Sequence, residues 1–270
     1  ASAVQDAFSL PQDIRLLTTD HLVAVGASSP PHQWLVVAGW PCQDLSPAGK
    51  SAGLQGERSA LLHHLVRVIG ALQQLQKLLP PGYIIENVPM QFHPESGIAK
   101  RDFDIICDML GHPTVLDAAQ FGSLAHRVRN FWTNLCTPMQ LAAATSQVVR
   151  PSGRTVKLAL GPGREPVQVK AADKPPRYCC NTPGSPMQAW PTFVAHPESY
   201  SFRPGQPGSV LTADGSHDQP TALEREFALG YPRDSTAAPG ITESQRRKAL
   251  GECMDSHCLQ CLFAITHAWW

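Results

Sequence analysis

Short apolar runs alternate with amphipathic helical stretches in the first half of the chain, and this alternation constrains the fold most. Each run is short and rich in apolar residues, as buried strands are. The runs lie at residues 35–39, 83–85, 114–117 and 129–132. Between them, residues 57–79 repeat leucine, valine and isoleucine at helical spacing, and residues 103–110 form a second helical stretch ended by Gly111. Strands that alternate with helices predict an α/β fold whose mostly parallel sheet is covered on both faces.

The composition of the sequence changes between residues 137 and 209, where proline and glycine become frequent and helical periodicity disappears. This stretch predicts a small irregular or β-rich insert. Helical patterns return at 220–229, 243–250 and 258–267. We therefore expect a catalytic α/β domain over 1–136, an insert over 137–209, and a return to the first domain over 210–270.

Composition narrows the class of protein only partly. The 270 residues are 43% hydrophobic and carry a net charge of zero, so the overall charge neither favours nor excludes nucleic acid. No signal peptide or membrane-spanning run is evident, and the eight cysteines lack a secreted framework. We expect no membrane partner and an intracellular protein, in the nucleus of a eukaryote or otherwise in the cytoplasm.

One cysteine cluster raises the question of a metal. Cys258 and Cys261, with Cys253 and His257 nearby, have the spacing of half a zinc site. No second Cys-x-x-Cys pair exists, and the helical pattern places Cys258 and Cys261 on one face with Leu262. We expect core packing here and no metal.

Basic residues gather inside the insert. Seven lie between residues 150 and 180, against two acidic residues. Such a stretch could face a phosphate backbone, although an ordinary solvated surface is the alternative.

Reactive side chains follow two of the expected strands. Cys42 comes shortly after residues 35–39, and Glu86 directly after 83–85. Parallel strands would bring both to one sheet edge, where open α/β sheets bind ligands. A thiol that adds to a ring carbon, with a carboxyl group at a ring nitrogen, suits attack on an aromatic heterocycle. Taken alone, a cysteine such as Cys42 is more often a small buried apolar residue.

Two arginines add to this pair. Arg127 and Arg129 alternate along a strand-like stretch, so both guanidinium groups should point to one face. There they could hold a carbonyl oxygen and a phosphate.

Taken in order, these motifs resemble those of the DNA (cytosine-5)-methyltransferases. Residues 39–46 resemble the nucleophile motif, 86–88 the glutamate motif and 122–132 the arginine motif. Residues 13–15, 224–232 and 247–254 resemble further motifs, and together they cover roughly 12–263. The resemblance implies a Rossmann-like S-adenosylmethionine-dependent fold with 137–209 as target-recognition insert. The arginine motif is most similar to the animal de novo branch, whereas Gln43 matches the bacterial and maintenance pattern.

The resemblance also implies a role for each matching residue. Cys42 would attack carbon 6 of a flipped-out cytosine in double-stranded DNA, and Glu86 would contact ring nitrogen 3 and the exocyclic amine. Arg129 would hold the cytosine carbonyl oxygen, with Arg127 supporting the site or a phosphate. S-adenosylmethionine would lie against Asp13, Ile14, Pro41, Leu61, Glu252, Cys253 and Met254. DNA would contact Ser46, Asn87, Arg150, Arg154, Lys174 and Arg177.

The chain departs from the family pattern in three places. No Phe-x-Gly-x-Gly turn for the cofactor precedes Asp13, and the first glycine is Gly26. We therefore expect a sheet without its first strand, and weak or no binding of S-adenosylmethionine by these 270 residues alone. Ala125 replaces a frequent glutamine, and Glu252 replaces an asparagine or arginine. A catalytically silent DNA-binding relative and a tRNA cytosine-5 methyltransferase remain alternatives.

Overall fold

The computed structural model describes residues 10–26, 33–45, 52–92, 97–167, 181, 184–196 and 199–268. Ser46, Lys174 and Arg177 lie outside them. The chain divides into two compact units. Unit 1 contains residues 1–115, 129–142 and 266–270, and unit 2 contains residues 116–128 and 143–265.

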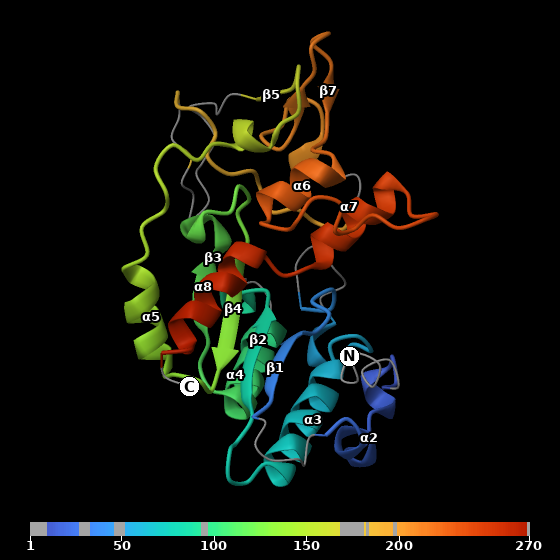
Figure 1. Ribbon diagram of the computed structural model, residues 1–270, viewed down its shortest axis with the longest axis vertical. Helices are drawn as coiled ribbons and strands as arrows, with labels where there is room; N and C mark the ends of the chain where they lie inside the picture. The colour runs from blue at the N-terminus through green and yellow to red at the C-terminus, as the bar shows by residue number, and fades with distance from the viewer. Residues whose placement is uncertain are drawn as a thin grey trace. The chain divides into compact units, whose positions relative to one another are not determined.

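Helices and strands alternate through the first half of the chain, as expected (Figure 1). The first half holds η1 (Ile14–Leu16), α2 (Thr19–Ala24), β1 (Leu35–Gly39), η2 (Gly53–Gln55), α3 (Leu61–Leu75), β2 (Gly82–Asn87), η3 (Met90–Phe92), α4 (Gly97–Leu110), β3 (Thr114–Asp117), η4 (Ala118–Phe121) and β4 (Val128–Thr133). The second half holds α5 (Pro138–Ser146), η5 (Val156–Ala159), β5 (Glu165–Pro166), η6 (Tyr200–Phe202), β6 (Val210–Leu211), β7 (His217–Asp218), α6 (Ala222–Ala228), α7 (Glu243–Glu252) and α8 (Ser256–Thr266).

The larger sheet has the strand order β1-β2-β4-β3. β1 and β2 are parallel, with Gly39 opposite Glu86, whereas β4 runs antiparallel to β2, with Asn130 opposite Asn87. The sheet of the described strands is therefore mixed. Its register aligns the end of β1, the end of β2 and the start of β4 at one edge.

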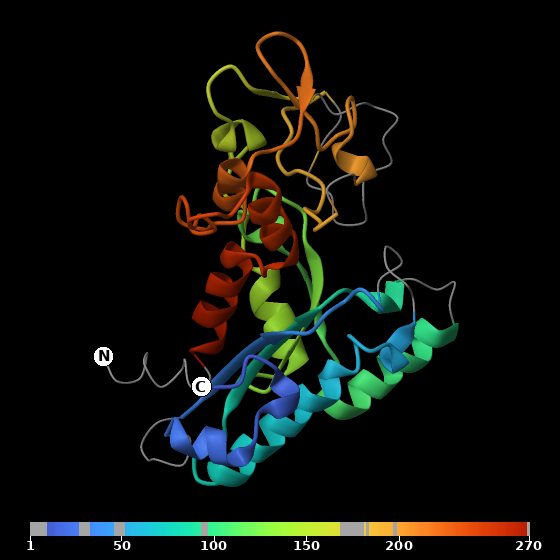
Figure 2. The same ribbon diagram turned by 90° about the vertical axis from the view of Figure 1, so that its right-hand side faces the viewer.

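Helices α3 and α4 cover one face of this sheet (Figure 2). Leu62, Leu65 and Ile69 of α3 and Ile106 of α4 share a buried core with Ile85 and Trp132 of the strands. Trp40, just beyond β1, packs on Trp132 with ring centroids 5.5 Å apart. This packing fixes the backbone that leads to Cys42.

Helix α3 is shorter than the expected 57–79. It begins at Leu61 because residues 57–60 form turns. It ends at Leu75 because Gln76 leaves the helical conformation, and its side-chain oxygen accepts a hydrogen bond from the Trp34 N–H at 3.2 Å.

Helix α5 lies where no helix was expected. Its sequence lacks an apolar stripe, so periodicity could not indicate it. The helix is instead begun by Pro138 and by a capping box: Gln140 N–H donates to Thr137 Oγ1 at 3.2 Å, and Thr137 N–H donates to Gln140 Oε1 at 2.8 Å.

Unit 2 has its own core and a small antiparallel sheet of order β5-β6-β7. Trp190, Phe193 and Phe202 form the aromatic centre of that core, and Leu250 of α7 packs with them. Cys258 of α8 is buried, as expected. Among the described residues, no three His, Cys, Asp or Glu side chains group as metal ligands do, and no helix is long and apolar enough to cross a membrane.

Candidate active site

The pairing of β1 with β2 brings the Cys42 loop beside Glu86. Gly39 is the last residue of β1 and pairs with Glu86, so Trp40-Pro41-Cys42 leaves the sheet next to the end of β2. Cys42 is half-buried against the core under α3 and α4, and its carbonyl accepts a hydrogen bond from Leu45 N–H at 3.0 Å. The thiol is therefore held in a turn at the sheet edge, as the sequence predicted.

Asn87 ties the ends of the two strands together. Its side-chain Nδ2 donates to the Trp40 carbonyl at 2.9 Å, and its Oδ1 accepts from Val88 N–H at 2.8 Å. The side chain is only 1% exposed. Asn87 thus positions the backbone before Cys42, and its expected DNA contact stays a prediction.

Asp44 fixes the other side of the Cys42 turn. Its Oδ2 accepts hydrogen bonds from the backbone N–H groups of Arg58 and Ser59, both at 3.1 Å, just before α3. Gly56 packs so closely that a Cβ there would lie 2.3 Å from Asp44 Oδ2. Sequence reasoning missed Asp44 because the groups that it caps are fourteen and fifteen residues away.

The antiparallel strand β4 places Arg129 beside Glu86. Arg129 Nε lies 2.7 Å from Glu86 Oε1, and the two side chains are 13% and 10% exposed. The expected carboxyl group and guanidinium group therefore form a mostly buried ion pair at the same edge as the Cys42 loop. Arg129 is positioned there because β4 starts where β2 ends.

Arg127 lies outside the strand on which both arginines were expected, because β4 begins at Val128. It belongs to unit 2, where its Nη1 donates to the Gly251 carbonyl at 3.4 Å. Asp117 Oδ1 accepts from Arg127 N–H at 2.8 Å, and Asp117 Oδ2 lies 2.7 Å from His126 Nδ1. The buried Asp117 carboxylate thus fixes the backbone just before β4.

A pocket of about 540 Å³ opens beside β1 in unit 1. It is lined by Gln12, Asp13, Ile14, Arg15, Ala38, Gly39, Trp40, Pro41, Leu61 and Leu65. Four expected cofactor contacts, Asp13, Ile14, Pro41 and Leu61, meet there. Asp13 caps the short helix η1, because its side chain accepts a hydrogen bond from Arg15 N–H.

Asp13 is paired with Arg15 at the mouth of this pocket. Arg15 Nη2 lies 2.6 Å from Asp13 Oδ2, and Arg15 Nε and its backbone N–H also donate to the carboxylate. These side-chain and backbone hydrogen bonds lower the pKa of Asp13 to about 2. The carboxylate stays ionised near neutral pH, so the pocket combines the Asp13–Arg15 ion pair with apolar walls.

The other three expected cofactor residues belong to unit 2. Glu252 is exposed at the end of α7, Cys253 Sγ donates to the Leu250 carbonyl at 3.2 Å, and the Met254 carbonyl accepts from Tyr231 Oη at 2.7 Å. Their cofactor contacts stay predictions.

The basic residues of the insert are largely engaged within unit 2. Arg150 donates to the carbonyls of Ala119, Ser123 (2.9 Å) and Gln188 (2.7 Å). Lys157 pairs with Glu165, and Arg164 pairs with Glu224 at 2.7 Å. Arg154 is half-buried. Of the four described basic residues, at least three therefore contribute to folding, which the charge pattern alone could not indicate.

Comparison with known proteins assigns the family. The profile of the family "C-5 cytosine-specific DNA methylase" matches residues 12–149, and the chain belongs to this family. Its sequence is 37% identical over 98 residues to the type II methyltransferase M2.BsuMI of Bacillus subtilis and 31% identical over 112 residues to M.MspI of a Moraxella species. These matches cover 35% and 40% of this chain but only 25% of each relative, so the chain spans about a quarter of their length.

Solved structures share the fold along nearly the whole chain. The Schizosaccharomyces pombe Dnmt2 methyltransferase superposes with a TM-score of 0.63 at 16% identity, over 95% of this chain and 83% of that one. The Entamoeba histolytica methyltransferase EhMeth gives 0.58 at 12% identity, over 99% and 86%. The predicted Rossmann-like methyltransferase fold and the predicted family are confirmed. The resemblance to the animal de novo branch stays a prediction.

Proposed function

We propose that the chain transfers a methyl group to carbon 5 of cytosine in double-stranded DNA, with Cys42 as the nucleophile. One arrangement carries the proposal: the Cys42 turn follows β1 beside Glu86, and Arg129 Nε lies 2.7 Å from Glu86 Oε1. A thiol, a carboxyl group and a guanidinium group thus come from three adjoining strands to one sheet edge.

These groups match the needs of a pyrimidine ring. The Cys42 sulfur bonds to carbon 6, while Glu86 hydrogen-bonds ring nitrogen 3 and the exocyclic amine and so stabilises the charge that develops. Arg129 turns from Glu86 to the ring carbonyl oxygen. Carbon 5 then takes the methyl group, a base removes its proton, and the sulfur–carbon bond breaks to restore the thiol. The stacked duplex hides carbon 6, so the cytosine must be flipped out.

The pocket beside β1 fits part of the methyl donor, S-adenosylmethionine. Asp13 offers an acceptor for the adenine amine, and Ile14, Pro41 and Leu61 offer apolar surface for a flat ring. When bound, the donor supplies an electrophilic methyl group. We propose Glu252, Cys253 and Met254 as further donor contacts.

Residues of the insert and of the sheet edge would contact DNA. We propose Arg154, Lys174 and Arg177 as phosphate contacts from a target-recognition insert at 137–209. Ser46 and Asn87 would act near the flipped base. Arg150 would act mainly by bracing the backbone at 119 and 123, because its guanidinium already donates to carbonyls there. Arg127 would support the site through the backbone next to β4.

Product analysis tests this function. The protein is incubated with labelled S-adenosylmethionine at a saturating concentration, because these 270 residues alone should bind the donor weakly. Either duplex DNA or tRNA is added, and the digested nucleic acid is analysed for 5-methylcytosine. We expect label in DNA, loss of label with Cys42→Ser, and retention with Cys107→Ser, a matched thiol in α4. Label in tRNA alone would support the RNA alternative, and DNA binding without any label would support a silent relative.

A further inference from the structure

The pocket beside β1 is lined in part by a very short element. Helix η1 has three residues, and together with Asp13 at its start it contributes Ile14 and Arg15 to the lining. The other lining residues include the end of β1, the turn after it, and Leu61 and Leu65 of α3. A single helical turn has little stability of its own. The shape of the pocket therefore depends on what fixes η1 to α3.

Apolar packing brings η1 against α3. Ile14 and Leu17 pack on a cluster that Leu22 forms with Val68 and Leu72 of α3. Such packing is non-directional, so it determines that η1 lies against the helix but not how its peptide groups are turned. A directional interaction has to supply the rest.

Arg67 of α3 makes directional contacts of this kind. Its Nη1 donates to the Leu17 carbonyl at 2.7 Å, and its Nη2 donates to the Ile14 carbonyl at 2.9 Å. Ile14 begins η1 and Leu17 follows its last residue, so the two bonds hold both ends of the turn. The planar guanidinium group reaches two acceptors at once, which a single ammonium group does less well.

One of these bonds reaches Asp13 through a single peptide group. The Ile14 carbonyl and the Arg15 N–H belong to the same planar peptide unit. Arg67 holds the oxygen of this unit, and its N–H donates to Asp13 Oδ1 at 2.9 Å. By fixing the carbonyl, Arg67 therefore also fixes the N–H that holds the Asp13 carboxylate.

We propose that Arg67 is a positioning residue that gives this pocket its preference for adenine. The inference rests on the proposed function, in which Asp13 accepts a hydrogen bond from the adenine amine of the methyl donor. Arg67 acts from outside the pocket lining, through Ile14 and Arg15. With Arg67 in place, the carboxylate is held where an amine can donate to it. Without Arg67, the peptide unit can turn, and a carboxylate that moves into water no longer distinguishes an amine from a carbonyl oxygen.

Ligand binding tests this inference without DNA and without catalysis. S-adenosylhomocysteine carries adenine, whereas S-inosylhomocysteine carries hypoxanthine, which has a carbonyl oxygen in place of the amine. Both are titrated by calorimetry up to millimolar concentration, because the chain should bind the donor weakly. We expect the unaltered chain to bind the adenine ligand about 10-fold more tightly, since the carbonyl oxygen would face the carboxylate. No binding, or no preference, would overturn the inference.

Variants of Arg67 and Asp13 test the route of the effect. Arg67→Met keeps the side-chain stem and removes the donors, so the preference should fall to about 3-fold or less. Arg67→Lys should keep an intermediate preference. Asp13→Ala should abolish the preference, and adding Arg67→Met to it should change nothing further, because both act on one hydrogen bond. If Arg67→Met weakens both ligands equally and leaves their ratio unchanged, Arg67 serves only the fold and the inference is wrong.

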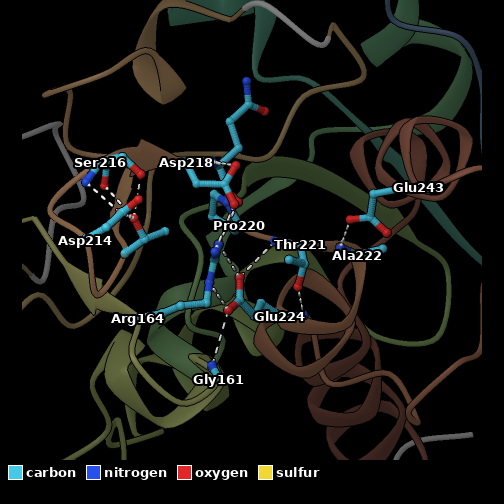
Figure 3. A network of polar contacts seen from close by, with 12 residues as sticks. Gly161, Arg164, Asp214, Ser216, Asp218, Pro220, Thr221, Ala222, Glu224 and Glu243 are labelled. Atoms are coloured by element: carbon cyan, nitrogen blue, oxygen red, sulfur yellow. Dashed lines mark hydrogen bonds and ion pairs between the residues drawn. The ribbon is translucent and has the colours of Figure 1, made fainter.

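Two controls separate positioning from stability. Lys77→Met changes an exposed basic residue just after α3 and should leave the preference unchanged. Arg164→Met removes the ion pairs with Asp218 and Glu224 in unit 2 (Figure 3), so it should lower the urea midpoint and still keep the preference. Loss of the preference in Arg164→Met would show that reduced stability is enough, and would contradict the role given to Arg67.

The proposed function can fail separately from this inference. Methylated DNA from a chain whose adenine preference survives Arg67→Met would refute the role of Arg67 alone. A preference that Arg67→Met removes, without any methylated product, would support the role of Arg67 and refute methyl transfer.

Discussion

Arg129 Nε lies 2.7 Å from Glu86 Oε1, and this ion pair joins the start of β4 to the end of β2. The two side chains that would hold a pyrimidine ring therefore form an ion pair with each other. Both residues lie at the sheet edge where the Cys42 turn follows β1. A substrate that enters must replace this pairing with its own hydrogen bonds.

The Glu86–Arg129 pair should contribute to stability as a coupled unit. Removing one partner leaves the other mostly buried and without its counter-ion, so Glu86→Gln and Arg129→Gln should each lower the free energy of unfolding. The double variant should lose less than the sum of the single losses, with a coupling of about 1–3 kcal/mol. Urea unfolding of the four proteins measures this, and strict additivity would show that the pair does not act as a unit.

Gly56→Ala should loosen the Cys42 turn. The new Cβ would lie 2.3 Å from Asp44 Oδ2, so the carboxylate would have to leave the N–H groups of Arg58 and Ser59. We expect a loss of about 1–2 kcal/mol in the free energy of unfolding, comparable to removal of a helix cap.

Gly70→Ala is the matched control for that variant. Gly70 lies inside α3 with no atom within 4 Å of an added Cβ, so alanine should stabilise the helix by about 0.5–1 kcal/mol. Equal effects of Gly56→Ala and Gly70→Ala in thermal or urea unfolding would contradict the role given to Asp44.

Asp255 should make the stability of the protein depend on pH. Burial raises the pKa of Asp255 to about 6, although its Oδ1 accepts from Cys258 N–H at 3.0 Å at the start of α8. The unfolded side chain ionises near pH 4, so the folded state holds the proton longer. The stability that this proton provides is complete below pH 4 and is lost as the pH rises to about 6.

Asp255→Asn tests this effect because asparagine keeps the oxygen acceptor and never ionises. Relative to wild type, the variant should gain stability between pH 4 and 6, on the order of 3 kcal/mol, and the difference should be constant above that range. Urea midpoints from pH 4 to 8 give the comparison. A difference that is flat or falls with pH would contradict the assigned direction of the shift.

The sequence predicted the elements whose signals are local. Residues 35–39 and 114–117 match β1 and β3 because both runs are short and apolar. The expected burial of 35–39 was wrong: β1 ends the strand order of the described sheet and is only partly buried, with Val37 40% exposed. The sequence also predicted that Cys42 lies near Glu86, because neighbouring parallel strands end at the same edge of a sheet. The sequence did not indicate that the side chains of Asp44, Asn87 and Arg150 fix distant backbone segments. Their partners lie far away in the sequence, and hydrogen bonds to backbone groups leave no residue pattern. Helix α5 was missed because its sequence signals are an N-terminal capping box and a proline, and not apolar residues at helical spacing.

The central claim is that Cys42 forms a covalent bond to carbon 6 of cytosine, and a trapped adduct measures it most directly. The protein is incubated with saturating S-adenosylmethionine and duplex DNA that carries 5-fluorocytosine, whose fluorine cannot leave carbon 5 as a proton does. We predict a denaturation-resistant protein–DNA adduct that mass spectrometry locates at Cys42, that is absent in Cys42→Ser and that persists in Cys107→Ser. An adduct at another residue, or DNA binding without an adduct, would contradict the account.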